Sequence, residues 1–181
     1  MRTLRWIAMV AVTMVAATVL GGQALAGGGP RTTQVSGRFS GHGVSDDPTF
    51  CTGIDGQYLD DRGVSAGTVT SEDPRLSGDF VNHVRTLLNL DTGIGRAVGH
   101  IVVTDPTTGE VKARFTIYVA GQIQPDGTGT LKGMEIGTVS DGSVLFANST
   151  TTTNPDGTFT GEFGGQPGPT DLAVIQGGNC R

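Results

Sequence analysis

The feature that most constrains the fold is a strict alternation of apolar and polar side chains over residues 110–119. A period of two is typical of a β-strand that buries one face. We expect the apolar side chains to point inward and the polar ones to face solvent. The alternative is a polar interior, in which the polar side chains would line a binding pocket. The apolar positions are Val111, Ala113, Phe115, Ile117 and Val119, and the polar ones are Glu110, Lys112, Arg114, Thr116 and Tyr118.

Turns rich in proline, aspartate and glycine separate segments of this kind. Proline presets the backbone of the first turn position, and glycine accepts the positive φ that such turns require. The turns lie at 105–109, 124–127, 140–142 and 154–157. They predict antiparallel hairpins that join strands at 95–104, 111–122, 128–139, 143–152 and 158–164. Further strands are expected at 33–44, 62–70, 76–90 and 171–176, where 76–90 is either one long strand or a strand followed by a short helix over 84–90.

The fold class follows from these hairpins. Consecutive hairpins with short turns close into an up-and-down barrel, whereas a sandwich usually needs longer crossovers. The 30 glycines of the chain also disfavour helix. We therefore predict an all-β fold, a single antiparallel up-and-down β-barrel of about eight strands, with a sandwich as the alternative. Glycines inside strands, such as Gly37, Gly99 and Gly133, indicate tight curvature or the close approach of a bulky side chain or a ligand.

The N-terminal segment has the organisation of a secretory signal peptide. Arg2 and Arg5 precede an apolar run over 6–20, and Ala24 and Ala26 fit a small-residue cleavage site. The run is short for a bilayer span, and no second run of that length follows it. We expect 1–26 to be a cleaved signal peptide, 27–32 a flexible N-terminal segment and 33–181 the barrel domain of a secreted, extracellular protein. The excess of arginine over lysine suggests a bacterial source.

Cys51 and Cys180 are the two cysteines of the chain. In an exported protein we expect them to form a disulfide bond that ties the C-terminal tail to an early loop. Closing a loop of this length removes roughly 4 to 5 kcal/mol of denatured-state entropy in the chain-entropy model. A redox role is the alternative, but the two cysteines lack the Cys-x-x-Cys spacing of redox sites.

Charge excludes some partners. Without Arg2 and Arg5, 10 basic residues remain against 17 acidic ones, a formal charge of −7. Nucleic-acid binding needs a basic surface that neutralises phosphates, and anionic membranes attract basic surfaces in the same way. We therefore expect neither nucleic acid nor, after signal cleavage, a membrane as a partner. The sequence does not indicate an oligomeric state.

Motifs for chemistry are weak. The chain has no Gly-x-Ser-x-Gly motif, and His42, His83 and His100 lack the spacing of a local metal site. The aspartates between 46 and 61 lack the pattern of a calcium loop, so a solvated acidic loop is favoured over a calcium site. We expect no metal and no cofactor, and no catalytic residue stands out. If the protein is an enzyme, it is a cofactor-free barrel of cyclase or isomerase type.

Candidate ligand-binding residues come from the polar faces of two strands. Asp79, His83 and Arg85 share a face within 76–90, and Arg114 and Tyr118 share one within 111–122. If those faces line the interior of the barrel, these five side chains would bind a ligand rather than catalyse a reaction. The alternative is that both faces are exposed outer surface.

The chain resembles the barrels of the allene oxide cyclase and dirigent type. The resemblance rests on the first strand, 35–41, on the glycine-rich hairpins of 93–165 and on the segment 159–165. The Gly-Gly-Thr-Gly-Lys-Phe signature of dirigent proteins is missing, so no functional residue is transferred. The resemblance implies an eight-stranded barrel with a hydrophobic cavity that steers cyclisation or coupling of small apolar molecules by shape.

Two functional hypotheses follow. The first is a secreted protein that binds a small apolar molecule in the barrel, with cyclase-like activity as a variant. The second is a structural or surface-interaction protein without a ligand cavity, in which the threonine tract 150–153 offers an exposed strand face. An internal cavity of a few hundred Å³ distinguishes the first hypothesis from the second.

Overall fold

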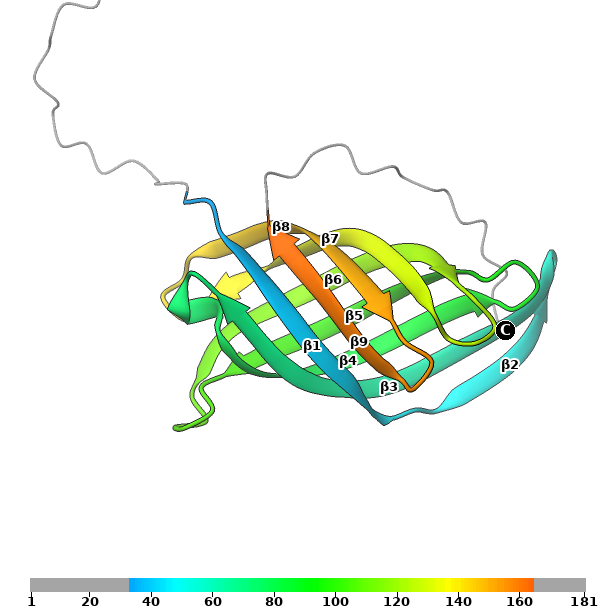
Figure 1. Cartoon of the computed structure of the whole chain (residues 1–181), viewed down its shortest axis with the longest axis horizontal. Helices are drawn as coiled ribbons and strands as arrows, with labels where there is room; N and C mark the ends of the chain where they lie inside the picture. The colour runs from blue at the N-terminus through cyan, green and yellow to red at the C-terminus, as the bar shows by residue number, and fades with distance from the viewer. Residues whose placement is uncertain (1–32, 165–181) are drawn as a thin grey trace, which may run out of the picture. The chain divides into compact units, whose positions relative to one another are not determined.

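The computed structural model describes residues 33–164 as an antiparallel β-barrel closed by eight strands (Figure 1). Each strand pairs with its neighbour in sequence from β3 to β9, and β1 lies between β9 and β3, which closes the sheet. The elements are β1 (Ser36–Ser45), β2 (Pro48–Gly53), β3 (Gly56–Ser71), the 3-10 helix η1 (Pro74–Leu76), β4 (Gly78–Asn89), β5 (Ile94–Thr104), β6 (Val111–Ile123), β7 (Gly129–Val139), β8 (Val144–Thr153) and β9 (Thr158–Gly164).

The predicted barrel and its strands are confirmed for the hairpins from β5 to β9. One segment differs from expectation, because the region of 46–61 is not a loop but a hairpin, in which β2 pairs with the first part of β3. Over 76–90 the chain forms the long strand of the first alternative, β4, and 84–89 belong to that strand rather than to a short helix. The expected strand at 171–176 lies outside the described residues.

The unusual length of β3 explains how β2 joins the fold. One edge of β3 pairs with β4 along most of its length. Its other edge pairs first with β2, over Gly56–Asp61, and then with β1, over Val64–Ser71. The hairpin of β2 and β3 therefore extends beyond the closed barrel, as Figure 1 shows.

The hairpin turns use the residues that the sequence indicated. The glycines that end the turns have positive φ, for example 88° at Gly127 and 79° at Gly157. The aspartate before each of these glycines accepts a hydrogen bond from the backbone of the turn. Asp126 accepts a hydrogen bond from the backbone N–H of Thr128 at 2.9 Å, and Asp156 accepts one from Thr158 at 3.0 Å. Such side-chain to backbone bonds two residues ahead stabilise the turn locally.

Glycine and phenylalanine pair across the inner face of β1 and β9. Gly37 lies opposite Phe163, Phe39 opposite Gly161 and Gly41 opposite Phe159. A Cβ built on Gly161 would lie 2.2 Å from the Phe39 ring, so only glycine leaves room for it. Gly37, Gly41 and Gly161 therefore accommodate close approach of aromatic side chains, one of the alternatives that the sequence offered. This packing lets large rings lie flat on a strongly curved sheet.

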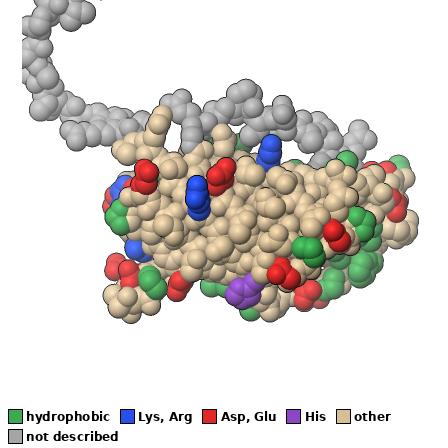
Figure 2. Space-filling view, viewed as in Figure 1, with side chains coloured by type: hydrophobic (Ala, Val, Ile, Leu, Met, Phe, Trp, Pro, Cys, Tyr) green, Lys and Arg blue, Asp and Glu red, His purple; other side chains and the backbone are tan. Residues whose placement is uncertain are grey.

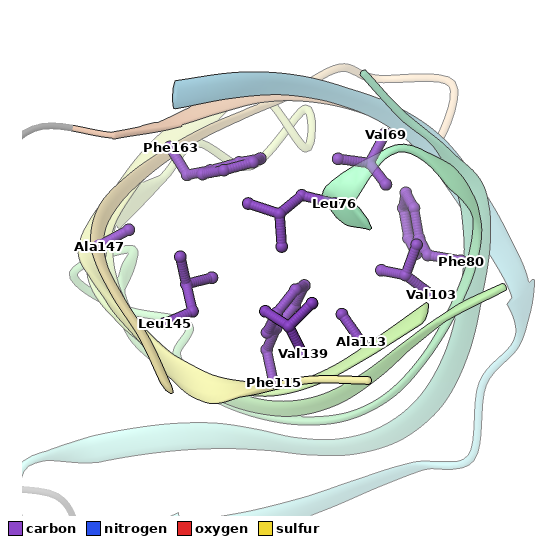
Figure 3. Packing of buried hydrophobic residues seen from close by; sticks show 10 residues of the cluster. All are labelled: Val69, Leu76, Phe80, Val103, Ala113, Phe115, Val139, Leu145, Ala147 and Phe163. Atoms are coloured by element: carbon purple, nitrogen blue, oxygen red, sulfur yellow. The ribbon is translucent and has the colours of Figure 1, made fainter. Parts of the chain in front are cut away.

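The interior is filled at one end and open at the other. Leu76 of η1, only 1% exposed, projects into the barrel axis among the side chains of the main core (Figure 3). Around it lie Val69, Phe80, Val103, Ala113, Phe115, Val139, Leu145, Ala147 and Phe163. A second cluster of Ala97, Ile117, Val119 and Leu131 lines the wall nearer the opposite end. The apolar stripe of β6 thus faces inward, as expected.

Candidate functional site

A cavity of about 500 Å³ lies inside the barrel. Its walls are mainly apolar, with side chains from the two core clusters on β3 to β9. Gly43, Val44 and Asp46 at the end of β1 and Gly157 before β9 line its mouth. These residues lie at the end of the barrel away from η1, because β1 ends and β9 begins there. The cavity therefore has a closed apolar floor and an accessible rim, and its volume suits a small organic molecule.

Glu135 of β7 is the one carboxylate among the buried interior side chains of the described chain, and it is 3% exposed. It belongs to the inward-facing phase of β7, between Gly133 and Gly137. Burial raises its pKa from 4.5 to about 7, and the nearby Ser149 hydroxyl opposes this only in part. The described residues place no cation in an ion pair with it. A buried carboxyl without a cationic partner is costly for the fold, which makes it a candidate for a role in function.

A further polar atom, Oδ1 of Asn82 on β4, is buried in the interior without a hydrogen-bond partner among the described residues. Asn82 lines the cavity together with Glu135. Gly99 on β5 leaves room for the Asn82 amide, since a Cβ there would lie 2.4 Å from Oδ1. Buried polar atoms are almost always paired, so an atom that the protein leaves unpaired beside a cavity is a candidate contact for a ligand.

The mouth of the cavity is acidic. Asp61 of β3 and Asp46 both line it. Asp61 accepts a hydrogen bond from the backbone N–H of Asp47 at 3.1 Å. Its pKa is raised, first because it is partly buried and then because the charges of Asp46, Asp47 and Asp60 repel its ionised form, although the bond from Asp47 opposes this. A ligand that enters the barrel therefore passes a concentration of negative charge.

The five side chains predicted to bind a ligand do not line this cavity. Asp79, His83, Arg85 and Arg114 are exposed on the outer face, and Tyr118 is 48% exposed there. The fold does not bring the two groups together, because β5 separates His83 and Arg85 on β4 from Arg114 and Tyr118 on β6. Their polar faces thus correspond to the exposed alternative, and binding by them would have to occur on the outside of the barrel.

His83 and Arg85 belong to an outer basic groove that the sequence did not reveal. The groove also contains Arg62, Arg96 and His100. Arg62 lies directly opposite Arg85, and His83 lies opposite His100. Asp60 accepts hydrogen bonds from Arg85 at 2.8 and 2.5 Å, and these bonds lower the pKa of Asp60 despite its burial.

Sequence reasoning missed Glu135 and Asn82, although a signal was present for each. On β7 the inward phase is Leu131, Gly133, Glu135, Gly137 and Val139, so Glu135 interrupts a small and apolar series. On β4, Asn82 lies between Phe80 and Val84 on the inward-facing side of the strand. Both Glu135 and Asn82 are thus polar residues at positions of a strand where the alternation predicts apolar ones.

Other expected features have a definite place in the structure. Thr151 and Thr153 of the threonine tract line the cavity, whereas Thr150 and Thr152 line a shallow outer groove with Arg38 and Glu162. Figure 2 shows the face of β1, β8 and β9, where uncharged polar side chains and backbone dominate. Among residues 33–164, no helix is long and apolar enough to cross a membrane, and no three His, Cys, Asp or Glu side chains come together as metal ligands.

The predicted disulfide and the predicted signal peptide stay predictions. Cys51 lies on β2, and its expected partner Cys180 lies outside the described residues. Residues 1–26, the expected signal peptide, also lie outside them, as do 27–32. Comparisons with protein-family models, with curated proteins and with solved structures find no match to the chain.

Proposed function

We propose that this protein binds a small, largely apolar molecule inside the barrel. The observation that carries the proposal is the cavity of about 500 Å³, walled by apolar side chains and supplied with the buried polar groups of Glu135 and Asn82. Apolar walls with a few polar groups are the usual composition of a small-molecule site, in which the polar groups fix orientation. The presence of a cavity also favours the ligand-binding hypothesis over the hypothesis of a barrel that acts only through its surface. The signal-like N-terminus supports binding outside the cell.

The proposal is tested with N-phenyl-1-naphthylamine, an uncharged apolar dye that fluoresces more strongly in apolar surroundings. Ala97 lines the cavity, and its neighbour Val98 faces the outer groove. We expect saturable 1:1 binding to the wild type and to V98W, and at least a tenfold weaker affinity for A97W, because the indole fills the space. L131W provides a second filling variant should A97W lower the midpoint of thermal unfolding.

Two results would overturn the proposal. One is the absence of saturable dye binding to the folded wild type. The other is an unchanged affinity in both filling variants while their circular dichroism spectra match that of the wild type. Either result would move the search for partners to the outer surface, including the groove beside Thr150 and Thr152.

Cyclisation of the bound molecule is a second candidate, suggested by the resemblance to the allene oxide cyclase and dirigent barrels. Glu135 favours it, since a buried carboxyl with a pKa of about 7 can both donate and accept a proton near neutral pH. Cyclisation is an isomerisation, so it needs no co-reactant. The test is chiral chromatography of the ring product from the uncharged methyl ester of an unstable unsaturated fatty-acid epoxide. An excess of one enantiomer that E135Q reduces would support the activity, and a racemic product would contradict it.

A further inference from the structure

The charge of the cavity has one sign. Its ionisable lining residues within the described chain are Asp46, Asp61 and Glu135, and no lysine, arginine or histidine is among the lining residues. The basic side chains of β3, β4 and β5 face outward instead. Low-dielectric walls concentrate the field of such charges along the cavity and raise the local concentration of ligands with the opposite charge.

The interior also presents hydrogen-bond acceptors rather than charged donors. Glu135 offers carboxylate oxygens when ionised, and Oδ1 of Asn82 is a buried acceptor without a partner. Ile117 on β6 and Ala147 on β8, which lie opposite Glu135, carry no polar side-chain atoms, and the Ser149 hydroxyl of β8 is a hydrogen-bonding neighbour without charge. A ligand that carries N–H donors or a positive charge would satisfy these groups, whereas a carboxylate ligand would be repelled.

Aromatic rings supply the third feature. Five of the seven phenylalanines of the chain line the cavity. They are Phe39, Phe80, Phe115, Phe159 and Phe163. The faces of aromatic rings attract organic cations, and this attraction is strongest where water is excluded. The same rings give apolar surface for a hydrocarbon chain, so they suit a molecule that combines both.

We propose that the ligand of this cavity is an amphiphilic organic cation, with an ammonium group beside Glu135 and its hydrocarbon part against the aromatic and aliphatic wall. This inference rests on the proposed function, because it requires a ligand in the barrel. The acidic mouth then favours entry of the cation, and Glu135 holds its head group in the interior.

The proposal implies that binding depends on pH. Glu135 must ionise to pair with the cation, so binding releases a proton wherever the free carboxyl is protonated. The elements packed on Glu135 add no other titrating group, since Ile117, Ala147 and Ser149 do not titrate, and Asp46 and Asp61 at the mouth are the remaining charges that face the cavity. The affinity for a permanently charged cation should therefore rise from pH 5.5 to pH 8.5.

Isothermal titration calorimetry with three ligands of equal chain length tests the inference. Decyltrimethylammonium is cationic, 1-decanol neutral and decanoate anionic. At pH 8 and low salt we expect the full mature chain to bind the cation at least tenfold more tightly than the alcohol, and decanoate most weakly. In E135Q the ratio of cation to alcohol affinity should fall at least tenfold, and the rise of cation affinity with pH should flatten.

E162Q is the matched control, because it removes the same charge from the outer face of β9. We expect its cation to alcohol ratio to stay within twofold of the wild type. Equal binding of cation and alcohol by the wild type, or equal ratios in E135Q and E162Q, would overturn the inference. Dye binding without cation binding would overturn the inference alone, whereas the loss of all binding, including that of the dye, would overturn the proposed function as well.

Discussion

Replacing Glu135 by glutamine should remove a pH-dependent penalty from the fold. The carboxyl has a pKa of about 7 in the folded protein and 4.5 as the reference value, because burial disfavours its ionised form. The folded state therefore holds its proton more tightly than the unfolded state does. As the pH rises above about 4.5, the unfolded state ionises first and the stability of the wild type falls, until both states are ionised above about 7.

The size of the effect follows from the two values. At about 1.4 kcal/mol per pH unit, the difference between 4.5 and about 7 corresponds to about 3 kcal/mol. Glutamine has nearly the same shape and does not titrate. E135Q should thus be more stable than the wild type by an increment that grows by about 3 kcal/mol between pH 4 and pH 8.

Urea unfolding of both proteins at half-unit steps from pH 4 to pH 9 measures this increment. Subtracting the two curves cancels the contributions of the other titrating groups. One of these is Asp60, whose pKa is lowered in the folded state, so that its ionised form stabilises the fold above about pH 3.8 and this stabilisation is lost as the pH falls further. A stability difference that stays constant across the range would refute the reasoning, because it would show that Glu135 titrates alike in the folded and unfolded states.

Four further substitutions, one of them a control, probe the packing. G161A should lower the free energy of unfolding by about 1 to 3 kcal/mol, since its Cβ would lie 2.2 Å from an aromatic carbon, whereas G43A, with open space around it, should change it little. L76A should cost about 2 to 5 kcal/mol, because its side chain fills the barrel axis. N82L should raise the free energy of unfolding by about 1 kcal/mol, since it removes a buried unpaired oxygen. Thermal and urea unfolding check each one, and equal stability of G161A and G43A, a neutral L76A or a destabilised N82L would contradict the packing described.

Local signals account for most of the predicted fold. The alternation in β6 and the turns that end at Gly127 and Gly157 are short-range features, so they could be recognised without knowledge of the partner strands. The hairpin of β2 and β3 was missed because its aspartates favour loops in isolation. Its pairing depends on the length of β3. Because β1 pairs only with the second part of one edge of β3, the first part of that edge stays available to β2, and this arrangement is a property of the closed barrel rather than of the local sequence.

The candidate site is harder to predict from the sequence than the strands are. His83 and Arg85 are ionisable side chains on one strand face, but such side chains on a strand most often face solvent, and these do. Glu135 lies instead in the phase of β7 that contains glycine and leucine. Its significance comes from burial and from the absence of a cation among the described cavity residues, and both depend on strands far away in sequence.

The most direct test of a ligand-binding interior is to locate the ligand by NMR. Backbone amide shifts of the ¹⁵N-labelled protein would be followed during titration with decyltrimethylammonium at pH 8. The account predicts that the largest changes fall on inward-facing cavity residues, such as Ala97, Ile117 and Glu135. Largest changes at Arg62 and Arg96 in the outer groove, or no saturable changes at all, would contradict it.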